Sequence, residues 1–281
     1  MNVRCSTVSG NNAANPTLGG GIHNRRTTGG TATTTLGSTL FKTGTTGSNI
    51  VNDTGTITSL GYNLSSDAAT GPYLIQATDR TSINPLIGAL ANNGGPTQTH
   101  ALQTGSPAFD TGKNFGLATD QRGLPRTADA SQVANASGGD GTDIGAFEIN
   151  PSGGSEVDSE PDGMADEFEL FYGVNNPGAD NDGDGLTNLQ EFKAGTNPLD
   201  ATSGLRITTV ARNTNDFVVT FNTAVAGKSY RLERKDALTD ALWGSISGVA
   251  DLNATSTGSA QITDTGGATT TTRFYHVRVL P

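Results

Sequence analysis

The chain has 281 residues, enough for two or three domains, with 38 glycines and only 6% aromatic residues. Long helical patterns are missing, so the composition predicts a mainly β protein. The net charge is −10, and residues 156–191 hold 11 acidic residues and no Lys or Arg. Because no basic patch stands out elsewhere, we expect no nucleic-acid partner, and no stretch is long enough to predict a membrane span.

The cysteine content and the first residues bear on the compartment. Cys5 is the only cysteine, so no disulfide can form within the chain. Calcium can stabilise an extracellular fold without disulfides, and it is abundant outside cells. No apolar run follows Met1–Arg4, so we predict no signal peptide there. An extracellular or cell-surface location then predicts a fragment, or a signal that was removed or lies elsewhere.

Residues 1–150 have the texture of a solenoid. Short β-prone runs alternate with Gly, Asn and Asp turns, as in Thr33–Leu40, Ser48–Val51 and Thr56–Leu60. Stacked coils need short strands, tight turns and inward aliphatic or Thr/Asn ladders. The period is irregular, but this pattern favours a parallel β-helix.

Several motifs in this region occur in the order known from one family. They are Ser59–Leu64, Asn84–Leu86, Asn93–Leu102, Gly105–Gly112, Thr119–Arg126 and Asp143–Glu148. Together they resemble the closing part of bacterial surface-exposed, right-handed parallel β-helix proteins of the choice-of-anchor type, over about residues 1–149. The resemblance implies more coils than the one or two expected here. The first coil would then expose an open strand edge. We expect this edge to be covered by missing upstream coils or by stacking on a second copy or another partner.

Parallel β-helices also include polysaccharide lyases and hydrolases, so a carbohydrate-active enzyme is the alternative. Such enzymes need a basic residue or paired carboxylates on one face. The candidates are Asp110, Asp120, Arg122 and Arg126. The simpler interpretation is that Asp120 and Arg122 hold a turn by a charge-assisted hydrogen bond, so we assign no catalytic residue.

Residues 151–203 contain two acidic twelve-residue loops in tandem. In the second loop, Asp180–Glu191, oxygen-bearing side chains occupy positions 1, 3, 5, 9 and 12, and Gly185 occupies position 6. Position 7 offers a backbone carbonyl, so the predicted ligands are Asp180, Asp182, Asp184, Leu186, Asn188 and Glu191. This is the spacing of an EF-hand calcium loop, and the predicted cofactor is Ca²⁺.

The first loop, Asp158–Glu169, repeats this spacing 22 residues earlier. Its predicted ligands are Asp158, Glu160, Asp162, Met164 through its carbonyl, Asp166 and Glu169. Glu160 is longer than the usual residue at position 3, and Pro161 stiffens position 4, so we predict tighter binding at the second loop. Apolar residues after each loop predict two short helices that pack together.

Residues 204–281 show alternation typical of strands. Predicted strands are Leu205–Val210, Phe217–Phe221, Ser229–Glu233, Ala260–Thr263 and Arg273–Val279. Their spacing predicts a small antiparallel β-sandwich, with Trp243 in its core; the alternative is that Trp243 or Tyr275 stacks on a sugar. The segments Tyr230–Glu233, Trp243 and Arg273–Val277 resemble fibronectin-III-like end domains of secreted bacterial proteins. Asp180–Pro198 resembles thrombospondin type 3 and dockerin-like repeats.

The predicted fold is therefore mainly β: the end of a right-handed parallel β-helix, a small EF-hand-like helical joint and a C-terminal antiparallel β-sandwich. The predicted function is non-catalytic, namely a calcium-stabilised extracellular or cell-surface protein for adhesion, display or structure. A polysaccharide or cell-surface ligand is the expected partner class. A dockerin-like docking module is the further alternative. Dockerins usually place small hydroxyl residues at loop positions 10 and 11. Here these positions are occupied by Glu167–Phe168 and Leu189–Gln190, which argues against a dockerin.

Overall fold

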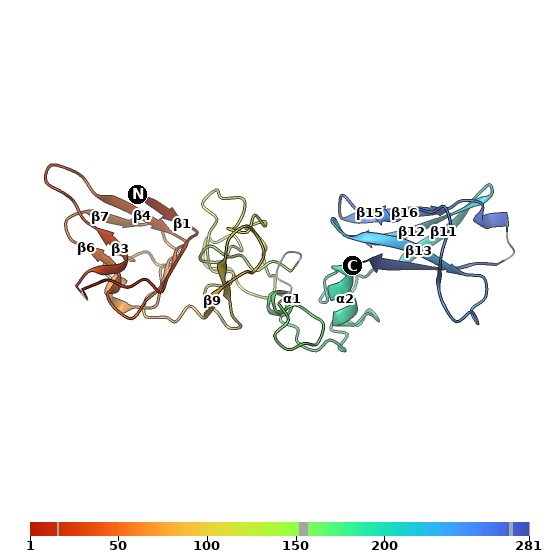
Figure 1. Cartoon of the computed structure of the whole chain (residues 1–281), viewed down its shortest axis with the longest axis horizontal. Helices are drawn as coiled ribbons and strands as arrows, with labels where there is room; N and C mark the ends of the chain where they lie inside the picture. Colours follow the sequence, from red (N-terminus) through yellow and green to blue (C-terminus); the bar gives the residue numbers. More distant parts are fainter. Residues whose placement is uncertain (16, 152–156, 270–271, 281) are drawn as a thin grey trace. The chain divides into compact units, whose positions relative to one another are not determined.

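The computed structural model describes residues 1–15, 17–151, 157–269 and 272–280. They form two compact units, which Figure 1 colours from red to blue along the chain. The first unit is Met1–Ser159 with Ala165–Gly173, and the second is Glu160–Met164 with Val174–Pro281. Of the two short α-helices, α1 (Asp166–Tyr172) belongs to the first unit and α2 (Asn188–Ala194) to the second. The sequence-based boundaries at residues 150 and 203 stay a prediction.

The first unit begins with three parallel sheets, which successive turns of the chain extend. The first sheet is β1 (Asn2–Arg4), β4 (Thr33–Gly37) and β7 (Thr56–Ser59). The second is β2 (Thr7–Ser9), β5 (Leu40–Lys42) and β8 (Leu64–Ser65). The third is β3 (Gly19–Asn24) and β6 (Ser48–Asn52). This stacking is that of a parallel β-helix, as predicted.

The predicted run Thr33–Leu40 is two strands rather than one, because the chain turns a corner at Ser38. Ser38 has φ +45°, and Cys5, one coil earlier, also has φ +45°. The corners stack: Cys5 N–H donates to Gly37 O at 2.9 Å, and Ser38 N–H donates to Gly61 O at 3.2 Å. Alternation of residue types does not reveal a corner whose left-handed residues are Cys and Ser.

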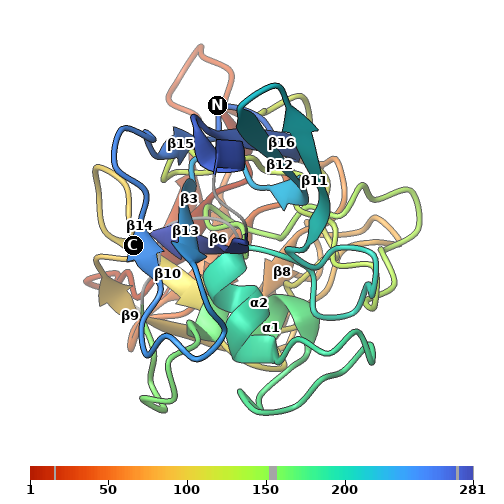
Figure 2. The same ribbon diagram turned by 90° about the vertical axis from the view of Figure 1, so that its right-hand side faces the viewer.

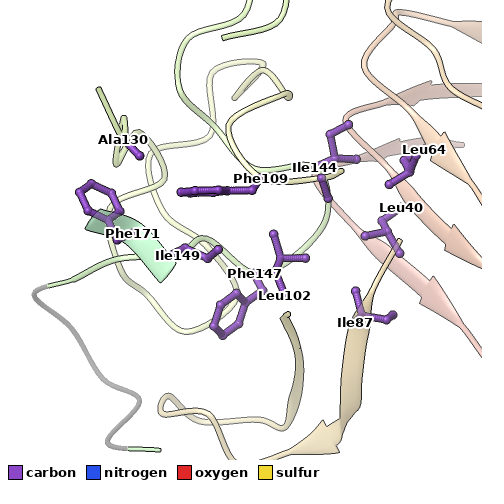
Figure 3. Packing of buried hydrophobic residues seen from close by; sticks show 11 residues of the cluster. Leu40, Leu64, Ile87, Leu102, Phe109, Ala130, Ile144, Phe147, Ile149 and Phe171 are labelled. Atoms are coloured by element: carbon purple, nitrogen blue, oxygen red, sulfur yellow. The ribbon is translucent and has the colours of Figure 1, made fainter. Parts of the chain in front are cut away.

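Two apolar clusters fill the first unit. One lies between the sheets and contains Ile22, Leu36, Phe41, Ile50 and Leu74. The other lies between the coils and the segment that follows them (Figure 3), with members Leu40, Leu64, Ile87, Leu102, Ala108, Phe109, Ala130, Ile144, Phe147, Ile149 and Phe171. Asn24 and Asn52 form the expected Asn ladder, with Nδ2 of the former 2.8 Å from Oδ1 of the latter.

The rest of the first unit is mostly turns, which explains its glycine content. It includes the 3₁₀ turn η1 (Ala68–Thr70) and the antiparallel hairpin of β9 (Ile87–Ala91) and β10 (Thr99–Leu102). Helix α1 closes this end, because Phe171 joins the second apolar cluster. Part of the acidic segment is therefore packed on the β-helix region.

The second unit has two antiparallel sheets over one core. The first sheet is β11 (Ile207–Asn213), β12 (Asp216–Ala224) and β16 (Gly258–Asp264), which lie side by side in Figure 2. In the second sheet, β13 (Ser229–Lys235) pairs with β14 (Gly244–Ser245), β15 (Leu252–Asn253) and β17 (Phe274–Leu280). The 3₁₀ turn η2 (Gly267–Thr269) follows β16. All five predicted strands are present, and the inward residues Val219, Phe221, Tyr230, Leu232 and Val277 are buried.

Trp243 corrects one expectation. It was predicted to fill the sandwich core, but it is 37% exposed and does not belong to the core cluster. Tyr230 and Phe221 are fully buried there, with ring centroids 5.3 Å apart. Among the helices of the described residues, none has the length and apolar character needed to cross a membrane.

Candidate metal centre

The backbone of the second acidic loop is folded around its own carboxylates. Asp180 accepts hydrogen bonds from the N–H groups of Gly183 (2.8 Å), Asp184 (3.1 Å) and Gly185 (2.9 Å). Gly185, at loop position 6, has φ +93°, and no atom lies within 4 Å of where its Cβ would be. Glycine is therefore needed there for backbone conformation rather than for space.

This folding brings the acidic side chains together. One carboxylate oxygen from each of Asp180, Asp182 and Asp184 lies within 4.8 Å of the other two. Three like charges at this distance repel one another unless a cation or protons compensate them. The predicted positions 1, 3 and 5 thus converge on one point.

Helix α2 supplies the predicted positions 9 and 12. Thr187 caps the helix in a capping box with Gln190, and Gly195 ends it with φ +75°. This short, well-capped helix carries Asn188, which is 1% exposed, and Glu191, which is fully buried. Each has one polar atom engaged: Asn188 Nδ2 donates to Asn176 O at 2.8 Å, and Glu191 Oε1 accepts from Thr196 Oγ1 at 3.3 Å.

Four buried oxygens of this loop have no hydrogen-bond partner among the described residues. They are Asp182 Oδ2, Asp184 Oδ2, Asn188 Oδ1 and Glu191 Oε2. A buried oxygen without a partner costs about 1–3 kcal/mol, and more when it is charged. These four stand at loop positions 3, 5, 9 and 12, so the donor set fits a hard, oxygen-preferring cation such as calcium.

Electrostatics at Glu191 agree with this geometry. Burial raises the pKa of Glu191 to about 7, and the charges of Asp182, Asp184 and Asp180 add to the rise. Without a cation, the acidic side chains of the loop therefore disfavour ionisation of Glu191. Leu186 donates its N–H to Asp184 Oδ1 at 2.6 Å, and the predicted use of its carbonyl as a ligand stays a prediction.

A residue outside the loop also contacts it, which sequence reasoning missed. Arg206 Nη2 lies 2.8 Å from Asp184 Oδ2, outside hydrogen-bonding geometry, and donates a hydrogen bond to the Asp184 carbonyl. Arg206 precedes β11, so the loop is tied to the second unit's first strand. It falls inside the predicted strand Leu205–Val210, and nothing in the sequence there indicated a contact with the loop.

The predicted ligands of the first loop are divided between the units. Asp158, Asp166 and Glu169 belong to the first unit, and Glu160, Asp162 and Met164 to the second. Within the first unit, Asp166 accepts from Ser159 N–H and Ser159 Oγ, both at 2.7 Å. Within the second, the buried Met164 donates its N–H to Asp162 Oδ1 at 2.9 Å. Ligation by these residues stays a prediction.

Glu167, which lies in the sequence between the predicted ligands Asp166 and Glu169, has a structural role that the sequence did not suggest. It is 7% exposed and receives Arg122 Nη1 on Oε2 at 3.0 Å and Nη2 on Oε1 at 3.1 Å. Glu167 Oε1 also accepts the N–H of Asn150 at 2.8 Å. Helix α1 is therefore fastened to the β-helix region by an ion pair.

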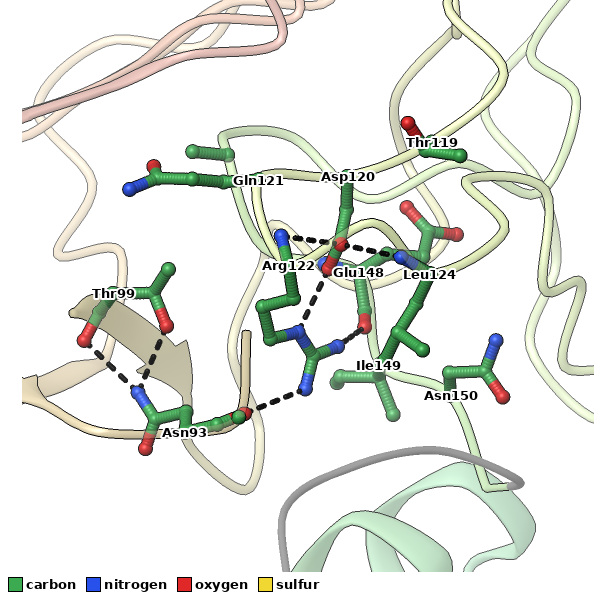
Figure 4. Close-up of polar contacts among 12 residues, drawn as sticks. Asn93, Thr99, Thr119, Asp120, Gln121, Arg122, Leu124, Glu148, Ile149 and Asn150 are labelled. Atoms are coloured by element: carbon green, nitrogen blue, oxygen red, sulfur yellow. Dashed lines mark hydrogen bonds and ion pairs between the residues drawn. The ribbon is translucent and has the colours of Figure 1, made fainter. Parts of the chain in front are cut away.

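The residues weighed for catalysis hold turns in the first unit. Asp110, Asp120, Arg122 and Arg126 are all at most 7% exposed. The side-chain Nε of Arg122 donates to Asp120 Oδ2 at 2.8 Å, and the backbone N–H of Arg122 donates to Asp120 Oδ1 at 2.8 Å (Figure 4). The predicted charge-assisted turn is confirmed. The guanidinium also stacks on Phe147, 3.7 Å from the ring centroid.

Comparison with known families decides what the second loop is. Residues 180–201 match the bacterial TSP3 repeat. No curated protein and no solved structure matches the chain. The TSP3 repeat covers all six predicted ligands of the second loop, and it ends before Arg206. Together with the acidic cluster it indicates calcium binding and an extracellular protein.

Proposed function

We propose that this chain is part of a bacterial extracellular or cell-surface protein whose acidic segment is ordered by calcium. The observation that carries the proposal is the set of four buried oxygens without hydrogen-bond partners at positions 3, 5, 9 and 12 of the TSP3 repeat, of which one, Asp184 Oδ2, is ion-paired with Arg206. A folded loop retains such a set when a cation satisfies it.

The calcium has a mechanical consequence. The segment 156–191 carries 11 acidic residues and no basic ones, so without a cation its charges repel one another. Calcium neutralises them, and because the ligands converge only in the folded loop, binding energy becomes folding energy. The segment then resists unfolding and proteolysis between the β modules that flank it.

The role in the cell that fits this build is non-catalytic: adhesion, display or structural support. It is supported by the buried, turn-holding positions of Asp110, Asp120, Arg122 and Arg126. We further propose that the first unit is the end of a choice-of-anchor β-helix, supported by its three parallel sheets, and that the second unit is fibronectin-III-like, supported by its two antiparallel sheets. β1, β2 and β3 each lie at a sheet edge, which supports stacking of further coils or of a second copy.

The dockerin-like alternative is less well supported. Its recognition positions in the first loop, Glu167 and Phe168, are 7% and 2% exposed and packed in the first unit. A partner could reach them only if α1 left that unit.

Calorimetric titration with calcium, combined with proteolysis, tests the proposal. Trypsin has no site in residues 156–191, so a glutamyl-specific protease is the suitable probe. We expect calcium binding, and cleavage in this segment with chelator or magnesium but not with calcium. Equal cleavage in calcium and chelator would overturn the mechanical role, and the absence of a calcium heat together with unchanged melting would overturn the metal site. Incubation with plant, algal and bacterial polysaccharides, read as new reducing or unsaturated ends, tests the enzyme alternative.

A further inference from the structure

Trp243 stands on the outer face of the second sheet in the second unit. Gly244 pairs with Arg234 and Ser245 with Glu233, so the same register places Trp243 opposite Lys235. Tyr230 and Leu232 of β13 point into the core, and the alternate residues Arg231, Glu233 and Lys235 therefore face outward. The outward residues of β17 are Phe274, His276 and Arg278, which pair with them.

Two side chains of this face support the indole ring. The ring centroid of His276 lies 5.3 Å from that of Trp243, at an interplanar angle of 40°. Lys235 Nζ lies 5.1 Å from the indole centroid, within range of a cation–π interaction. The ring is held in place by these contacts, yet more than a third of Trp243 remains exposed. The exposed part of the indole is an apolar ring face on which a ligand ring can stack.

The charges beside the ring are unevenly compensated. Arg231 is paired with Asp251, with nitrogen–oxygen distances of 2.6 and 2.8 Å. Glu233 is buried and contacts both His276 (3.3 Å) and Arg278 (3.2 Å). Among the described residues, Lys235 has no carboxylate partner.

Lys235 Nζ donates only to a backbone carbonyl, that of Asp240. The Asp240 carboxylate turns back onto the loop, where Oδ2 accepts the N–H groups of Asp236 (3.2 Å) and Ala237 (2.9 Å). One positive charge therefore remains available next to the ring.

We propose that Trp243 and Lys235 form a binding site for an acidic polysaccharide. The apolar C–H face of a pyranose ring stacks on the indole, and the carboxylate of a uronic acid pairs with the Lys235 ammonium. Charge favours this ligand class, because residues 204–281 hold eight Arg or Lys and six Asp or Glu, a net +2 in a chain of net −10. This site goes beyond the calcium-dependent role and does not require calcium.

The tryptophan itself reports on the site, because Trp243 is the only one in the chain. Short galacturonate oligomers would be titrated into the full chain in chelator, which also prevents gelling with calcium, and the tryptophan emission would be followed. We expect a saturable change in emission with galacturonate, and at least tenfold weaker binding of uncharged glucose oligomers of the same length. Added salt should weaken galacturonate binding.

Variants separate the two contacts. Trp243→Ala should abolish retention on immobilised polygalacturonate. Lys235→Gln should weaken galacturonate binding about tenfold while the melting temperature stays unchanged. Leu238→Ala is the matched control, because Leu238 is 68% exposed in the same loop and lies outside the proposed contacts. Unchanged emission and no retention of the wild type, equal binding of neutral and acidic oligomers, or full binding by Lys235→Gln would each overturn the site.

Discussion

Within the second unit, Arg206 links the TSP3 repeat to the start of strand β11 through Asp184. Its Nη2 lies 2.8 Å from Asp184 Oδ2 and donates to the Asp184 carbonyl, while Asp184 Oδ1 accepts the Leu186 N–H. The side chain of Asp184 is 1% exposed. A predicted metal ligand is thus oriented by the residue that begins the following β module.

Replacing Arg206 should therefore weaken calcium binding. Residues that orient metal ligands are typically worth 10–100-fold in affinity. For Arg206→Gln we expect the lower end, about tenfold, because removing a positive charge from the site offsets part of the loss. Calorimetric titration measures this. Arg212→Gln is the matched control, since Arg212 lies exposed in β11 and donates to Thr214 O. Equal or tighter binding by Arg206→Gln would contradict the positioning role.

The two acidic loops should bind calcium with unequal affinity. Glu191→Gln removes a charge from the position that closes the second loop, so it should abolish the tighter of two binding phases. Glu169→Gln should remove only the weaker phase, because Glu160 and Pro161 make the first loop less regular. Titration of each variant resolves the phases, with Asp236→Asn as a control that removes one acid outside the loops. Loss of the weaker phase in Glu191→Gln would reverse the assignment.

The sequence predicted the metal centre better than the surroundings of that centre. Ligand spacing is local, so Asp180, Asp182 and Asp184 could be assigned from the chain alone, and the structure brings their carboxylates together. Arg206 and Glu167 were missed, because their partners Asp184 and Arg122 are set by tertiary packing. A charged residue just before a strand or in a short helix carries no periodic signal that would reveal such a partner.

The fold shows the same limit. The strands of the second unit alternate inward and outward residues, so the strands themselves could be predicted. The sequence did not show on which face of the sheet a residue at the end of a strand lies. Trp243 directly precedes strand β14, which has only two residues and is too short to show an alternating pattern. In the first unit the corner at Ser38 divided one predicted strand into two, because the residue types do not mark the left-handed backbone at Ser38.

The ion pair between Arg122 and Glu167 should control how firmly helix α1 is attached. Both side chains are almost entirely buried, and breaking a buried ion pair typically costs about 3–5 kcal/mol; we expect less here, because Arg122 keeps its ion pair with Asp120. Glu167→Gln should therefore lower the melting temperature and speed hydrogen exchange in residues 166–172, even in chelator. Lys193→Gln is the control, an exposed helical residue of the second unit. Unchanged exchange in α1 would show that Phe171 and its apolar neighbours hold the helix without the ion pair.

The first unit should lose stability as the pH rises. Burial raises the pKa of Asp110 to about 7, with the charge of Asp129 adding to the rise and the Ala130 N–H opposing it. Burial also raises the pKa of Asp143 and of Glu148, which face each other across a hydrogen bond from Asp143 N–H to Glu148 Oε2 of 2.9 Å. In the unfolded chain these groups ionise near pH 4. The folded state therefore binds more protons above about pH 4, and the stability that they contribute is lost as the pH rises, between pH 4 and 7 for Asp110 and up to higher pH for Asp143 and Glu148.

Thermal unfolding in chelator at pH 5 and pH 8 measures this loss. For Asp110 alone we expect about 2 kcal/mol, or a fall of roughly 4–8 °C in the melting temperature of a domain of this size. Asp110→Asn cannot ionise, and Asn tolerates the left-handed φ of +54° at this position, so its melting temperature should fall clearly less between the two pH values. Comparing the two proteins cancels the titration of the acidic loops, which both contain. A wild type that gains stability toward pH 8, or a variant with the same slope, would mean that the Asp110 carboxyl is ionised throughout this range.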